Sequence, residues 1–325
     1  MSEAAAPMID IRDLNVTFTG GRKPVRAVNG VTFSVPRGEV LALLGESGSG
    51  KSVTLRSILN MHPKKRTVSS GSITAGGLDV MALSGRALAD YRGKLTSMIF
   101  QEPLLAFDPV YTVGAQIVES IRRHEPVSKA EAYARALGLL QKVKIPSAER
   151  RLAAYPHEMS GGMRQRAMIA LALACNPQIL LADEPTTALD ATVQIQILLL
   201  LRELQRELGL TVILVTHDIG VAVEVADRVA VMYAGRIVET GPVREIIRNP
   251  RHPYTQGLLA SRAHGAMTGA RLDAIPGAPP DLSSLPPGCA FRPRCKFAVT
   301  DCETIQPDET AVSPGHWMRC LRSAA

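Results

Sequence analysis

The chain has 325 residues, 46% of them hydrophobic and 21% charged, which is typical of a globular protein with a sizeable core. Its start, MSEAAAPMIDIRDLNV, lacks the features of a signal peptide, and no apolar run reaches the roughly 18 residues of a membrane span. The net charge of +7 is diffuse, since residues 1–250 hold 29 Lys and Arg against 24 Asp and Glu. We therefore expect neither a membrane span nor a nucleic-acid partner.

A phosphate-binding loop is the first feature that predicts chemistry. The apolar run from Val40 to Leu44 predicts a buried strand, and an amphipathic helical pattern follows Lys51. Between them, GESGSGKS matches the P-loop pattern G-x-x-x-x-G-K-[ST], whose backbone N–H groups and helix dipole bind phosphate. We expect Lys51 to reach the β- and γ-phosphates and the Ser52 hydroxyl to bind Mg²⁺. The predicted nucleotide-binding residues of this loop are Gly45, Glu46, Ser47, Gly48, Ser49, Gly50, Lys51 and Ser52.

Two later apolar runs also end in polar residues. QILLADEP predicts a strand ending at Asp183, which suits a Mg²⁺ partner, and the adjacent Glu184 suits a general base for the attacking water. The run TVILVTHD places His217 after a third strand. Because ligands of parallel α/β sheets bind at the carboxyl ends of strands, we expect these residues to converge with Lys51 and His217 to contact the γ-phosphate.

The 131 residues between Lys51 and Asp183 exceed what one crossover needs, and they contain IFQEP and YPHEMSGGMRQR. Here the sequence resembles the ATP-binding subunit of ATP-binding-cassette (ABC) transporters, over about residues 8–255. The resemblance implies that Gln101 is the Q-loop glutamine and a further Mg²⁺ ligand, and that His217 is the switch histidine. It also implies that Phe18 stacks on adenine. The expected catalytic residues are thus Glu184, His217 and Gln101.

The stretch MSGGM (residues 159–163) resembles the family signature LSGGQ, with Met159 and Met163 as the departures. TALD, ending at Asp190, resembles the D-loop. The resemblance implies that this surface completes the ATP site of a second cassette, so that ATP holds two cassettes together and hydrolysis releases them. The residues assigned to it are Ser160, Gly161, Gly162, Met163 and Asp190.

The expected fold is α/β, a RecA-like P-loop NTPase core over residues 1–255 with an inserted helical subdomain at about 102–161. A chromosome-organising or DNA-repair ATPase would carry a long heptad insertion, and a paired-cassette translation factor would carry two P-loops. The sequence has neither feature, so an importer subunit is the preferred interpretation over these two.

The segments NPRHPYTQGLL and IPGAPPDLSSLPPGCAFRPRC resemble the dipeptide/oligopeptide branch of importer ATPases, with related systems such as nickel uptake. The resemblance implies an ATPase that powers import of di- or oligopeptides, with nickel chelates or another small solute as the alternative. The implied partners are two permease subunits, a second ATPase that is more often a paralogue, and an extracytoplasmic solute-binding protein. The implied location is peripheral, on the cytoplasmic face of the inner membrane, through the permeases.

Four of the five cysteines lie in the irregular extension predicted at residues 256–325. Their spacing, C-x5-C-x6-C-x17-C, lacks the short knuckles usual for zinc, whereas a [4Fe–4S] cluster takes four thiolates at looser spacing. The resemblance also implies such a cluster, while zinc and metal-free thiols remain as alternatives. The predicted ligands are Cys289, Cys295, Cys302 and Cys320.

Basic residues near these cysteines, Arg292, Arg294 and Lys296, are expected to offset the charge of a cluster. We expect the cluster to be a structural clip without a step in ATP hydrolysis, with redox sensing as the alternative. On this hypothesis, Cys295→Ser would loosen the tail and leave the P-loop able to bind ATP. His316 is expected to be structural.

Overall fold

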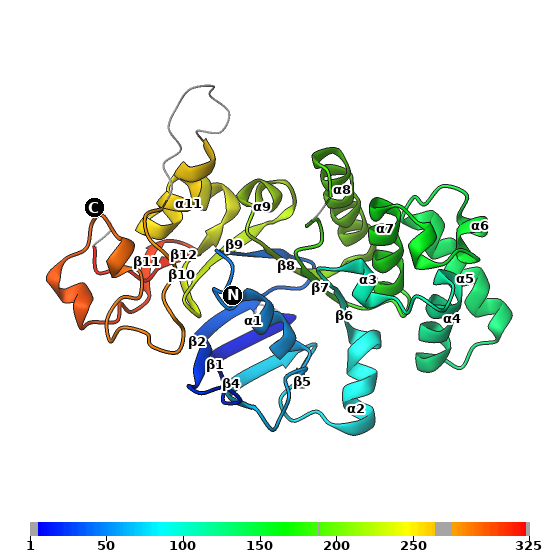
Figure 1. The fold of residues 1–325 in the computed structure, drawn as a ribbon, viewed down its shortest axis with the longest axis horizontal. Coiled ribbons are helices and arrows are strands. Elements are labelled where there is room, and N and C mark those ends of the chain that lie inside the picture. Colours follow the sequence, from blue (N-terminus) through cyan, green and yellow to red (C-terminus); the bar gives the residue numbers. More distant parts are fainter. Residues whose placement is uncertain (1–5, 188, 264–274, 323–325) are drawn as a thin grey trace, which may run out of the picture. The chain divides into compact units, whose positions relative to one another are not determined.

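The computed structural model describes residues 6–187, 189–263 and 275–322 (Figure 1). The chain divides into two compact units. The first contains Met1–Met8, Pro36–Gly38 and Ala82–Leu214, and the second contains Ile9–Val35, Glu39–Met81 and Val215–Ala325. The outermost residues of the two predicted domains, and Ala188 of the predicted D-loop, lie outside the described residues.

The first unit is built on two parallel strands, β6 (Thr96–Ile99) and β7 (Ile179–Asp183), whose register pairs Ile99 with Ala182. All five residues of β7 are buried, as expected for a parallel strand covered on both faces. Its helices are α2 (Gly85–Asp90), the kinked turn η1 (Tyr91–Leu95), α3 (Pro103–Ala106), α4 (Val113–His124), α5 (Lys129–Lys142), α6 (Ala148–Leu152), η2 (Pro156–Glu158), α7 (Gly161–Ala172) and α8 (Ala191–Leu208).

The interval in which a helical subdomain is predicted contains α3, α4, α5, α6 and η2 (Figure 1). Two of these helices begin at side-chain caps. Thr112 caps α4 by accepting the Ala115 N–H, and Ser128 and Glu131 form a capping box on α5. Helix α4 then packs on α5, α6 and α7 through its buried face, which places the signature segment at the start of α7 on a rigid base.

The second unit contains the P-loop, between β3 (Val40–Leu44) and α1 (Lys51–Ile58). Strand β3 is buried at every position and pairs in parallel with β9. Strand β8 (Thr211–Thr216) begins in the first unit and ends in the second. The other elements are β1 (Ile9–Phe18), β2 (Val25–Val35), β4 (Thr67–Ala75), β5 (Leu78–Asp79), α9 (Ile219–Val225), β9 (Arg228–Tyr233), β10 (Arg236–Pro242), α10 (Val243–Arg248) and α11 (Pro253–Ala263). Strands β2, β1, β4 and β5 form an antiparallel sheet in that order.

The C-terminal extension belongs to the same compact unit as the P-loop. Its described part holds the short helices η4 (Arg292–Arg294) and η5 (Thr300–Glu303) and the strands β11 (Thr310–Ser313) and β12 (His316–Met318). Strand β12 pairs antiparallel with β10, and Arg319 N–H adds a bond to the carbonyl of Val238. The extension therefore adds two strands beside β10, as well as the irregular cysteine-rich segment that the sequence predicts.

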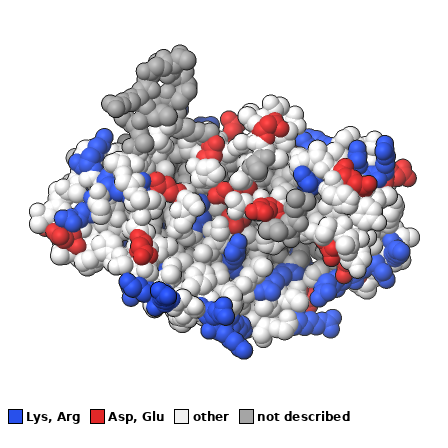
Figure 2. All heavy atoms as spheres, viewed as in Figure 1, with Lys and Arg blue, Asp and Glu red and all other residues white. Residues whose placement is uncertain are grey.

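Charged side chains of both signs are interspersed over most of the face drawn in Figure 2. Among the described residues, opposite charges pair at the surface, such as Lys142 with Glu207 and Arg319 with Glu309. Exposed pairs of this kind contribute little to stability, about 0–1 kcal/mol each. On this face, therefore, the diffuse positive excess counted in the sequence remains diffuse in three dimensions.

Candidate nucleotide-binding and hydrolysis site

The P-loop has a backbone that only glycine fits at two positions. A Cβ on Gly45 would lie 2.2 Å from the carbonyl oxygen of Met232, and one on Gly50 would lie 2.3 Å from that of Ala27. Gly50 has φ +104°, in the region that L side chains rarely adopt. The carbonyl groups of Met232 and Ala27 thus constrain the conformation of the loop where it leads into α1. The N-terminus of a helix is a favourable site for an anion.

The predicted phosphate lysine lies within this loop. The Lys51 ammonium donates to the carbonyl oxygens of Gly45, at 2.7 Å, and Glu46, at 2.8 Å. Only 5% of Lys51 is exposed, so its charge is held at the loop by backbone acceptors. Ser52 follows in the first turn of α1. The loop is therefore pre-shaped, with its cation already in position for an anionic ligand.

Glu46 is held by three hydrogen bonds, one to Tyr254 and two to Arg294. Its N–H donates to the Tyr254 hydroxyl at 2.9 Å, and its carboxylate oxygens accept from Arg294 Nη1 and Nη2 at 2.7 and 2.9 Å. Arg294 was expected beside the cysteines, whereas its guanidinium contacts the P-loop. No role for Tyr254 is predicted from the sequence. It lies in the segment NPRHPYTQGLL, which carries the family resemblance, but the sequence does not indicate its contact with Glu46.

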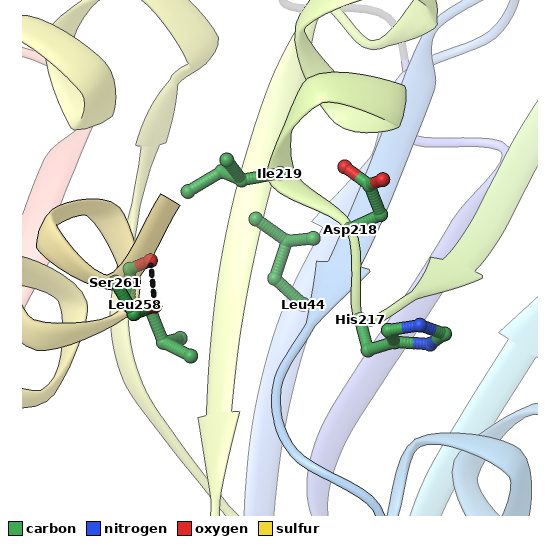
Figure 3. Close-up of a pocket in the computed structure, with 6 residues that line it drawn as sticks. All are labelled: Leu44, His217, Asp218, Ile219, Leu258 and Ser261. Carbon is green, nitrogen blue, oxygen red and sulfur yellow. Dashed lines mark hydrogen bonds between the residues drawn. The ribbon is translucent and has the colours of Figure 1, made fainter. Parts of the chain in front are cut away.

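His217 directly follows β8 and is exposed. It lines a pocket with Leu44, Asp218, Ile219, Leu258 and Ser261 (Figure 3). Leu44 is the residue before Gly45, so His217 and the start of the P-loop border one pocket of the second unit. Asp218 caps α9 by accepting N–H groups of Gly220 and Val221, at 2.7 and 3.3 Å. This cap fixes the turn that carries His217.

Phe18, the residue predicted to stack on adenine, is the last residue of β1 and is half-buried. Its ring meets His62 edge-on, with ring centroids 5.6 Å apart. Burial lowers the pKa of His62, a shift opposed by a hydrogen bond with the backbone of Val53. Phe18 thus packs partly against the His62 ring.

In the first unit the structure brings Gln101 and Glu184 together. Gln101 follows β6 and Glu184 follows β7, and the Gln101 amide donates to Glu184 Oε2 at 3.4 Å. Thr187 Oγ donates to the same oxygen at 2.9 Å. Glu184 has φ +46°, a strained conformation for a non-glycine residue that costs on the order of 1–3 kcal/mol. Asp183, 2% exposed, ends the strand just before it.

The signature residues lie at the N-terminus of α7. Ser160 is exposed and accepts the Met163 N–H at 3.3 Å as the helix cap, while Met159 beside it is buried. A Cβ on Gly162 would lie 2.9 Å from Val193 Cγ1, near the start of α8. Asp190 caps α8 through the Val193 N–H at 2.9 Å. The structure therefore brings the signature segment and the D-loop aspartate together.

The four C-terminal cysteines line one small cavity, with Phe291, Phe297 and the side chains of Arg292 and Arg322 among its other walls. All four are free thiols. Burial raises the pKa of Cys289, Cys295 and Cys320, and backbone N–H bonds from Phe291, Phe297 and Arg322 oppose this shift. Within residues 6–187, 189–263 and 275–322, no three His, Cys, Asp or Glu are grouped closely enough to hold a metal ion. The predicted cluster therefore has convergent thiols without a formed ligand set.

Comparison with known proteins defines the class of protein. A family model described as ABC transporter matches residues 28–187, and one described as oligopeptide/dipeptide transporter, C-terminal region, matches residues 238–302. The fold is similar to that of a dimeric ATP-binding cassette solved in a post-hydrolysis state with ADP and phosphate. That likeness has TM-score 0.66 and 30% identity, over 73% of this chain and 99% of that one. The fold is that of an ABC ATPase.

Two curated relatives place the chain within that class. It is 50% identical to a putative peptide import ATP-binding protein of Brucella melitensis, over 97% of each chain. It is 47% identical to the dipeptide transport ATP-binding protein of Bacillus subtilis, over 96% of this chain and 94% of that one. The chain belongs to the family of ABC transporter ATP-binding subunits, in its oligopeptide/dipeptide branch. It is an ATPase coupled to transport, and neither the DNA-repair nor the translation interpretation is supported.

Proposed function

We propose that the chain powers the import of di- or oligopeptides. The observation that carries this proposal is the match of residues 238–302 to the oligopeptide/dipeptide transporter region, on a chain with a pre-shaped P-loop. Two relatives are named for peptide import and dipeptide transport. These findings favour peptides over nickel chelates or another small solute.

The proposed partners follow from this function. They are two membrane permeases, a second ATPase that is identical or paralogous, and an extracytoplasmic binding protein that selects the cargo. No helix in the described parts of the chain has the length and apolarity needed to cross a membrane. We therefore propose that the chain attaches peripherally to the cytoplasmic face of the inner membrane through the permeases. The proposed domains remain a cassette at residues 1–255, with its helical subdomain at about 102–161, and an extension at 256–325.

In the proposed mechanism the P-loop binds the nucleotide phosphates and Lys51 pairs with the β- and γ-phosphates. Ser52, Asp183 and Gln101 offer hydroxyl, carboxylate and amide oxygens, the hard donors that Mg²⁺ prefers. When bound, Mg²⁺ neutralises part of the phosphate charge. Glu184 accepts a proton from the attacking water, with its carboxylate oriented by Thr187 and Gln101. His217 contacts the γ-phosphate, and Phe18 stacks on adenine.

Dimer closure is the proposed link between ATP and transport. The exposed Ser160 and the N–H groups at the start of α7 suit a phosphate held by another cassette. The signature residues pack close to the D-loop, so both surfaces are fixed relative to each other. ATP between two cassettes would close the pair and drive the permeases, and hydrolysis would reset it.

Lys51→Ala is expected to weaken ATP binding about 10–100-fold, because one charge-assisted contact to each of two phosphates is lost. Calorimetric titration with Mg²⁺ and a non-hydrolysable ATP analogue measures this change. Lys142→Ala, which removes a surface cation paired with Glu207, is the matched control and should bind as the wild type does. Equal affinities in Lys51→Ala and wild type would exclude Lys51 from the phosphate site.

We further propose a [4Fe–4S] cluster as the occupant of the cysteine cavity. Four free thiols share that cavity, and backbone N–H groups donate to three of them, which partly opposes the rise in pKa that burial causes. Arg292 and Arg322 line the same cavity and offer positive charge. When bound, a cluster cross-links the extension and holds it folded. Zinc at the same four cysteines is the alternative.

Metal analysis of protein purified without oxygen tests this assignment. We expect about four irons and four acid-labile sulfides per chain. Cys295→Ser should lose most of this metal and make the extension sensitive to protease, whereas Cys175→Ser should retain both properties because Cys175 contacts the carbonyl of Ser120 instead. One zinc without sulfide would establish the zinc alternative, and no metal would exclude both.

A further inference from the structure

The C-terminal extension reaches the nucleotide site through Arg294. The ion pair between Arg294 and Glu46 joins residues 248 positions apart, and 5% of the Arg294 side chain is exposed. Both guanidinium nitrogens of the fork bind one carboxylate, which fixes direction as well as distance. The contact therefore has the geometry of a built pair and differs from the exposed pairs elsewhere on the surface.

Arg294 is itself held rigidly. Its Nε donates to the carbonyl of Pro276 at 2.8 Å, and its guanidinium lies 5.8 Å from the ring centroid of Tyr233 and 6.0 Å from that of Phe291. Hydrogen bonding to Glu46 raises the pKa of Arg294, so it stays charged. A cation fixed by backbone and aromatic rings cannot relax toward solvent, and Glu46 is placed by it.

The aromatic contacts also include Tyr254, the second residue that holds Glu46. Tyr233, Tyr254 and Phe291 pack against one another, with centroids 4.6 to 5.4 Å apart, and all three are nearly fully buried. Tyr254 presents its hydroxyl to the Glu46 N–H, and burial raises the pKa of that hydroxyl. The backbone and the carboxylate of Glu46 are thus both fixed by residues from beyond position 250.

Glu46 in turn fixes the loop. Its carbonyl accepts the Lys51 ammonium at 2.8 Å and the Ser49 N–H at 3.2 Å. A shift of Glu46 therefore moves the Lys51 ammonium and the backbone at Ser49.

We propose that Arg294 is a positioning residue of the ATP site: through Glu46, the cysteine-rich extension sets the conformation of the P-loop and hence the affinity for nucleotide. This proposal rests on the proposed assignment of the P-loop as the nucleotide site. Arg294 neighbours Cys295, and Phe291 also lines the cysteine cavity, so a change at the cysteines is transmitted to Glu46. On this proposal Cys295→Ser still binds ATP, as the sequence predicts, but more weakly than wild type does.

The test is a double-mutant cycle on the full-length chain, with Mg²⁺ and a non-hydrolysable ATP analogue titrated calorimetrically. Arg294→Ala and Glu46→Ala should each weaken binding about tenfold, the equivalent of one charged hydrogen-bonded pair. The double variant should be no weaker than either single variant. Arg294→Lys, which keeps the charge and one donor, should recover part of the affinity. The control is Arg319→Ala, which removes an Arg–Glu pair within the extension and should bind normally.

Tyr254→Phe covers the case in which Arg294→Ala fails to fold, since it removes only the hydroxyl that binds the Glu46 N–H; it should bind a few-fold more weakly. Folded Arg294→Ala that binds within twofold of wild type, or losses that simply add in the double variant, would overturn the proposal. Wild type that fails to bind nucleotide, or Lys51→Ala that binds normally, would instead refute the assignment of the P-loop. The two failures are therefore distinguishable.

Discussion

Glu184→Gln is expected to lower ATP turnover about 10²–10⁴-fold while ATP binding is retained, because it removes the general base without changing the shape of the side chain. Glutamine can still accept the Thr187 hydroxyl through its amide oxygen, so the turn after β7 should survive. Binding energy from the P-loop is untouched, and without hydrolysis the ATP-bound, closed dimer should accumulate.

Steady-state phosphate release and size-exclusion chromatography with ATP measure these two effects. Glu203→Gln is the matched control: it alters a carboxylate of α8 that pairs with Lys144 at the surface, and should turn over normally. Turnover of Glu184→Gln within about threefold of wild type would remove Glu184 as the base, since general-base catalysis contributes far more than that.

Glu239→Ala is expected to lower the free energy of unfolding of the second unit by about 3–5 kcal/mol, because several buried hydrogen-bond donors lose their acceptor at about 1–3 kcal/mol each. Glu239 and His316 have side chains with 0% exposure and meet at 2.7 Å. The same carboxylate accepts the N–H groups of Arg251 and His252, at 2.8 and 2.9 Å. One side chain thus ties β10 both to the segment before α11 and to β12 of the extension.

Urea unfolding followed by circular dichroism measures the loss, and limited proteolysis locates it in the extension. Glu309→Ala removes the surface partner of Arg319 and should cost less than about 1 kcal/mol. Similar losses in the two variants would mean that the Glu239–His316 pair does not anchor the extension.

Much of the candidate nucleotide site could be predicted because each of its parts corresponds to a short, local sequence pattern. Strands β3 and β7 are continuous apolar runs. Gly45 and Glu184 follow them, and both are recognised from the local sequence, Gly45 by the P-loop pattern and Glu184 by its place after the apolar run. Glycine was required at Gly45 and Gly50 because neighbouring carbonyls leave no room for a Cβ, and the P-loop pattern already encodes that requirement.

The contacts that join the extension to the loop could not be predicted. The sequence predicts a role for Arg294 only beside the neighbouring cysteines, because a partner 248 positions away leaves no periodic signal. Tyr254 was quoted only as part of a family segment. His316, which is expected to be structural, contacts Glu239 in the interior, and this partner lies 77 positions before it. Long-range ion pairs depend on the finished fold, and local pattern does not specify them.

The pairing of β12 with β10 also protects a sheet edge. Strand β10 pairs with β9 on one side and with β12 on the other. A chain cut after residue 255 would present β10 as an open edge, with unpaired N–H and carbonyl groups at Glu239 and Thr240 that invite intermolecular strand pairing. The extension thus protects the cassette from self-association through β10. Removing it is expected to expose this strand edge.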